Sequence, residues 1–72
     1  MTTETHIDGL ERRIDVMERL ATKHEQDAAQ IIGSTPAADR DRSNLIHSAT
    51  SCRVDAIKCR QILAGLREQE AA

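Results

Sequence analysis

The sequence predicts an all-α fold, an antiparallel hairpin of two amphipathic helices that pack through a coiled-coil-like seam. Two stretches carry apolar residues at alternating spacings of three and four, a Gly-Ser-Thr-Pro break separates them, and nothing in the chain has the pattern of a strand. Because 72 residues suffice for only one domain, we expect residues 1–72 to form a single helical hairpin.

The first helix is expected over about residues 4–32. Its apolar residues follow an unbroken heptad pattern, in which the a and d positions face one partner helix and form what is called here the seam. The seam positions are Ile7, Leu10, Ile14, Met17, Ala21, His24, Ala28 and Ile31. This regularity predicts a long helix with one side packed against a single neighbour.

The break between the helices is expected at residues 33–35. Gly33 suits the left-handed backbone conformation that follows many helix ends. Thr35 suits the N-cap of the next helix, and Pro36 suits its first position. A connection this short makes the two helices antiparallel neighbours.

The second helix is expected over about residues 36–68, with Ser43 as an alternative cap that would start the packed part near Asn44. Its seam is Leu45, Ala49, Cys52, Ala56, Cys59, Leu63 and Leu66. The middle of this seam consists of small residues, so we expect the two helix backbones to approach closely there.

Composition limits both the core and the function. The chain contains no Phe, Tyr or Trp, so each core residue buries less apolar area than an aromatic one would. A short chain with so small a core favours self-association or a partner. The net charge is −2, no basic surface is evident, and no aromatic ring is present to stack on unpaired bases. We therefore expect no nucleic-acid partner.

No catalytic, cofactor-binding or metal-binding residue is predicted. Cys52 and Cys59 lie seven residues apart, which is wider than the usual zinc-ligand spacing, so we interpret them as small buried seam residues. The carboxylates of the first helix alternate with basic side chains, as on an ordinary solvated face. Two thin helices also cannot enclose a pocket of the usual size. We therefore expect a protein that is not an enzyme and needs no cofactor.

The sequence favours a cytoplasmic protein with no membrane partner. The polar opening MTTETHIDGLERR lacks the apolar centre of a signal peptide, and no apolar run is long enough to span a bilayer. Two cysteines on one helix at this spacing are too far apart for a disulfide, which suits a reducing compartment.

Apolar residues outside the two seams form the predicted partner-binding site. Placed at about 100° per residue, they fall to the side of the seams or opposite them. They are Val16, Leu20, Ile46, Val54 and Ile57. Single exposed apolar residues are normal, but several on a chain with so small a core favour an interface. We expect Ile46, Val54 and Ile57, together with Leu20, to form its main part.

The polar opening, the first amphipathic helix, the Gly33-Ser34-Thr35-Pro36 turn and the second helix together cover nearly the whole chain. This architecture resembles the small co-chaperone subunits of type III secretion systems. The resemblance implies a heterodimer with a larger helical-repeat chaperone subunit, in which the two hold the needle subunit in the cytoplasm before export. It also implies no enzymatic activity, and it assigns no contacts to individual residues. Two alternatives remain, a self-assembling homodimeric four-helix bundle and a small antitoxin or regulator that masks a target protein.

Overall fold

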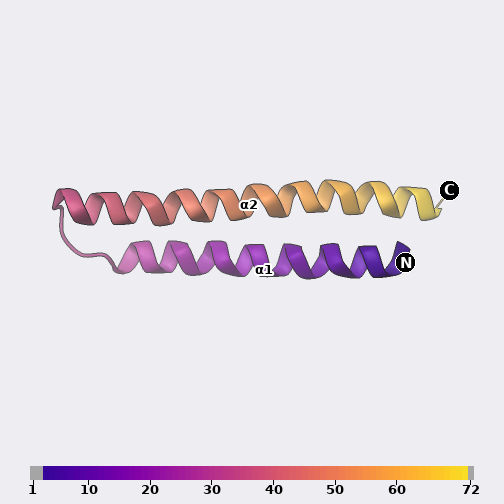
Figure 1. Cartoon of the computed structure of the whole chain (residues 1–72), viewed down its shortest axis with the longest axis horizontal. Coiled ribbons are helices and arrows are strands. Elements are labelled where there is room, and N and C mark those ends of the chain that lie inside the picture. The colour runs from indigo at the N-terminus through magenta and orange to yellow at the C-terminus, as the bar shows by residue number, and fades with distance from the viewer. Residues whose placement is uncertain (1–2, 72) are drawn as a thin grey trace.

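The computed structural model describes residues 3–71 and consists of two long helices lying side by side (Figure 1). Helix α1 spans Thr3–Gln30 and helix α2 spans Pro36–Ala71. The helices run antiparallel and pack against each other, and the part of the chain that is described contains no strand. The molecule is a thin rod with extents of 56 × 15 × 14 Å. The predicted all-α helical hairpin is confirmed.

Helix α1 ends two residues before the expected position. The N–H of Ile31 donates to the carbonyl oxygen of Ala28 at 3.2 Å, a tightened contact of the kind that closes many helix ends. Gly33 then adopts a φ of +102°, in the region where a side chain would be strained. The connection therefore covers residues 31–35 and includes two isoleucines that we expected in the helix.

Helix α2 begins at Pro36 and not near Asn44. The Oγ1 atom of Thr35 accepts a hydrogen bond of 3.1 Å from the N–H of Ala38, which is the contact expected of an N-cap. Proline at the first helical position loses no hydrogen bond, because that N–H would have no partner in the helix. The helix continues to Ala71, beyond the expected end near residue 68.

The core lies along the predicted seam, and every seam residue is buried or half-buried. Its main cluster comprises Ile14, Ala56, Cys59 and Leu63, with Ile7, Leu10 and Met17 packed around it. This cluster lies toward the open end of the hairpin, away from the turn. Nearer the turn, the buried side chains are alanines, at positions 21, 28 and 49. The apolar contact between the helices is therefore thinnest near the turn.

Arg42 continues the seam of α2 toward the turn, although its charge conceals this in the sequence. It lies three residues before Leu45 and is half-buried. Its Nη2 atom donates to the carbonyl oxygen of Gly33 at 2.8 Å, and its Nη1 atom pairs with Asp39 at 2.9 Å. The guanidinium therefore fastens the connection to α2 where apolar contact is small.

Candidate protein-docking groove

A ladder of ion pairs joins the two helices along one flank of the rod. Each step of seven residues forward along α1 matches seven residues back along α2, and every acid is on α1 and every base on α2. The pairs are Glu25 with Arg53, Glu18 with Arg60, and Glu11 with Arg67. These are e positions of the heptads, which set partner choice and orientation in coiled coils.

The charged ladder stops before it reaches the turn. Seven residues before Arg53, α2 has Ile46 at the same heptad position, whereas Ile32, seven residues after Glu25, lies in the connection beyond the end of α1. Both isoleucines are exposed. The same flank therefore changes from charged to apolar over the last part of the rod.

An open groove of about 690 Å³ lies on this flank, in the half of the rod next to the turn. Its apolar lining consists of Ala28, Ala29, Ile31, Ile46, Val54 and Ile57. The alanine side chains on α1 are small, so space remains between them and the larger apolar side chains of α2. Ile46 and Ile57 are about three helical turns apart, so the α2 wall of the groove runs for roughly 16 Å.

The polar side chains that line the groove already have partners within the chain. Arg53 pairs with Glu25, and Arg42 is held by the connection and Asp39. The Oγ1 atom of Thr50 donates to the carbonyl oxygen of Ile46 at 3.0 Å. The groove therefore favours an apolar occupant over one that must form new hydrogen bonds.

The structure divides the five predicted partner-binding residues between two flanks. All of them are exposed, but only Ile46, Val54 and Ile57 line the groove. Leu20 and Val16 occupy g and c positions of α1, on the flank opposite the ladder. Leu20 therefore does not line the groove, because the antiparallel register places the e positions of both helices on the other side of the rod. Its contact with a partner stays a prediction.

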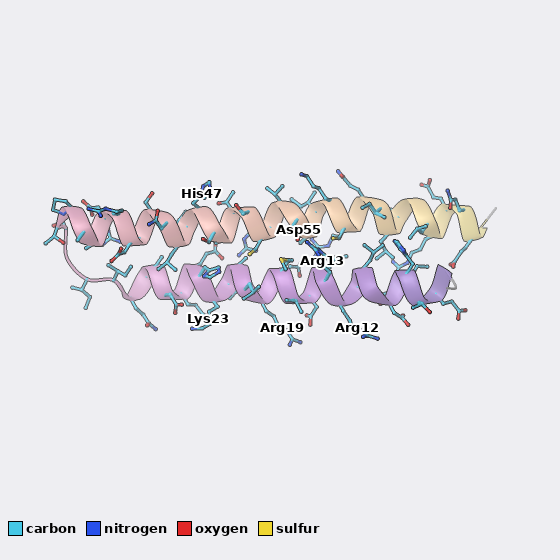
Figure 2. All side chains as sticks on the ribbon, in the orientation of Figure 1. Arg12, Arg13, Arg19, Lys23, His47 and Asp55 are labelled. Atoms are coloured by element: carbon cyan, nitrogen blue, oxygen red, sulfur yellow. The ribbon has the colours of Figure 1, made fainter. Side chains whose placement is uncertain are left out.

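On the opposite flank, Arg13 and Asp55 form an ion pair in which both Nε and Nη2 of Arg13 donate hydrogen bonds. Nη2 of Arg13 lies 2.7 Å from Oδ2 of Asp55, and Nε lies 3.0 Å from the same oxygen. Figure 2 shows these two side chains pointing toward each other between the helices, whereas Arg12 and Arg19 point away from α2. The hydrogen bonds from Arg13 lower the pKa of Asp55, and the contact raises the pKa of Arg13.

Because the pKa of Asp55 is lowered in the folded chain, the contact stabilises the hairpin fully at pH values above the ordinary aspartate pKa of about 3.9. This stabilisation is lost as the pH falls through the lowered pKa of the folded state. We expect Asp55→Asn to unfold at lower urea than the wild type at neutral pH, and the difference to shrink in acid. Urea titrations followed by circular dichroism at several pH values measure this. Asp8→Asn, at an exposed position of α1, is the control. A constant difference at every pH would contradict the assignment.

Residues 3–71 also bear on metal and membrane binding. In this range, no group of three or more His, Cys, Asp and Glu side chains is placed to hold a metal ion. Cys59 is buried and Cys52 is half-buried, both in the seam as predicted, and both are free thiols. Neither α1 nor α2, as described, has a stretch long and apolar enough to cross a membrane.

Comparisons of this chain with protein-family models, with curated proteins and with solved structures find no match. The inference of a function therefore rests on the groove, its chemistry and the exposed apolar residues around it.

Proposed function

We propose that this protein is a non-enzymatic binding module whose groove receives an amphipathic helix of a larger protein. The observation that carries the proposal is an apolar groove whose polar lining groups already have partners within the chain. Both walls of the groove are formed mainly by helices, whose backbone groups are already bonded, so an extended strand would gain no backbone hydrogen bonds there. A helix satisfies its own backbone and brings an apolar stripe, which is what such a groove accepts.

The driving force for docking is burial of apolar area. Ile46, Val54 and Ile57 are each about half exposed. Full burial of such a side chain contributes roughly 1.5–3 kcal/mol, so covering the exposed half contributes about 1 kcal/mol for each residue. The charged side chains that line the groove, Glu25, Arg42 and Arg53, are already paired within the chain. We therefore expect docking to depend little on salt, unlike the ion-pair ladder.

The specific form of the proposal is a co-chaperone in the cytoplasm. In this form the hairpin pairs with a larger helical-repeat chaperone, and together they hold a type III secretion needle subunit before export. The resemblance in architecture supports it. So does the presence of exposed apolar residues on two flanks, Ile57 on one and Leu20 on the other, because the concave face of a helical-repeat protein can contact both flanks of a thin rod.

The test uses a synthetic amphipathic peptide of about four helical turns with one leucine stripe. In an NMR titration of the full chain, we expect shifts centred on the groove. We expect Ile57→Asp to weaken peptide binding by about tenfold or more. The matched control is Ile62→Asp, because both isoleucines lie on α2 and are 51% exposed, but Ile62 does not line the groove.

Two results would count against this function. Shifts centred on Val16 and Leu20 would place docking on the other flank, and equal binding by the Ile57→Asp and Ile62→Asp variants would exclude the groove. The co-chaperone form has a further requirement. Co-expression with a helical-repeat chaperone of a type III system must give a stoichiometric complex that Ile57→Asp weakens.

A further inference from the structure

The connection between the helices carries an apolar side chain that has no role in the hairpin itself. Ile32 is 94% exposed, more than any other large apolar residue that the structure describes. Its neighbour Ile31 lines the groove, so the exposed side chain and the groove lie at the same end of the rod. Ile32 buries almost no area within its own chain and therefore contributes almost nothing to folding.

We propose that two copies of this chain associate tip to tip, with Ile32 of each copy seated in the groove of the other. The inference rests on the proposed function, because it uses the same groove, and it names what covers that groove when no partner helix is bound. The groove favours an apolar group that needs no hydrogen bond, and the side chain of Ile32 is such a group. A reciprocal contact of this kind has two-fold symmetry and closes after two copies.

The ion-pair ladder limits how far the two copies can overlap. Side-by-side packing along the whole ladder flank would bury the Glu18–Arg60 and Glu11–Arg67 pairs, and removing paired charges from water is costly. The part of the flank from Ile57 to the turn holds the Glu25–Arg53 and Arg42–Asp39 pairs, and contact there leaves the two pairs farther from the turn in water. The overlap is therefore confined to the tips, and the dimer is longer than one rod.

The small area of the contact makes the dimer weak. A stable interface buries about 800 Å² on each partner, which is far more than one isoleucine and three half-exposed side chains supply. Self-association is therefore expected only at high protein concentration. A partner helix that fills the length of the groove would displace Ile32 of the second copy.

Sedimentation velocity over a range of concentrations tests the inference on the full chain. We expect reversible dimer formation that Ile32→Asp and Ile57→Asp each weaken by about tenfold or more, while Ile62→Asp leaves it unchanged. Mixing the Ile32→Asp and Ile57→Asp proteins restores one of the two contacts, because the first keeps its groove and the second keeps its Ile32. The mixture should therefore associate more strongly than either variant alone. Circular dichroism confirms that each variant remains helical.

Small-angle X-ray scattering at high concentration separates this dimer from a four-helix bundle. A tip-to-tip dimer, in which the rods overlap only over the groove, has a maximum dimension well above the 56 Å of one rod, whereas a side-by-side bundle stays near 56 Å. A chain that stays monomeric, a compact bundle, or association that is unaffected by Ile32→Asp would each overturn the inference. Those results leave the proposed function standing if Ile57→Asp still weakens peptide binding. If it does not, the proposed function fails separately.

Discussion

Replacing Leu63 by Asp is expected to unfold the hairpin. Leu63 is 7% exposed and belongs to the main apolar cluster with Ile14, Ala56 and Cys59. Loss of a buried leucine side chain alone costs about 2–5 kcal/mol, and a buried carboxylate without a partner adds to that cost. A small domain has only about 5–15 kcal/mol of stability, and this core is mostly alanine where it approaches the turn. Far-UV circular dichroism and urea unfolding measure the effect.

The neighbouring residue supplies the control for this substitution. Ile62 is 51% exposed, so Ile62→Asp introduces the same side chain one position earlier in the same helix without burying it. We expect Ile62→Asp to remain helical with nearly unchanged stability. If Leu63→Asp also stays folded, the packing of α2 on α1 is wrong. If both variants unfold, the cause is the low helix propensity of aspartate and not the loss of packing in the seam.

Reversing the basic half of the ladder is expected to destabilise the hairpin strongly at low salt. The variant replaces Arg53, Arg60 and Arg67 with glutamate. Each ion pair between exposed side chains contributes about 0.2–1 kcal/mol, and like charges at the same positions add a repulsion of similar size. Three substitutions of two charge units each also lower the net charge from −2 to −8. Urea unfolding at low and high salt measures the loss, which should shrink as salt screens the charges.

A second reversal distinguishes pairing from net charge. Replacing Glu11, Glu18 and Glu25 with arginine in the same chain rebuilds the ladder with opposite polarity, and we expect most of the lost stability to return. The control replaces Arg12, Arg40 and Lys58 with glutamate, which gives the same net charge at exposed positions without a cross-helix ion pair. If this control loses as much stability as the ladder reversal, overall charge and not the register of the helices is responsible.

The sequence predicted the buried seam and the turn correctly, because both depend on residues that are close together in the sequence. Whether Ile14 or Leu63 is buried depends on heptad spacing, and whether Gly33 and Thr35 lie in a turn depends on their own backbone preferences. The end of α1 was predicted two residues too late, because the apolar pattern continues through Ile31 and Ile32. A hydrophobic pattern does not distinguish the last helical residue from an apolar residue of the connection.

The groove was only partly predictable, because it depends on how the two helices are aligned. The angular position of Ile46 and Ile57 is visible in one helix, and both were predicted to be off the seam. The hollow beside them arises because Ala28 and Ala29 lack bulk, and that matters only once α1 is placed opposite. The spacing of Glu11, Glu18 and Glu25 against three arginines could have fixed this alignment. Arg42 could likewise have been placed in the seam by counting back from Leu45.

The uneven distribution of the core along the rod has a consequence for the order of folding. Contacts near the turn, such as Arg42 with Gly33, close a short segment and cost little chain entropy. The cluster of Ile14 with Leu63, and the packing of Leu10 against it, require residues far apart in sequence to meet. The contacts that form at the lowest entropy cost are therefore not the contacts that contribute most to stability. We therefore expect the chain to fold as one cooperative unit. The groove lies at the thinly packed end, where local opening requires the least free energy and the surface can adapt to its occupant.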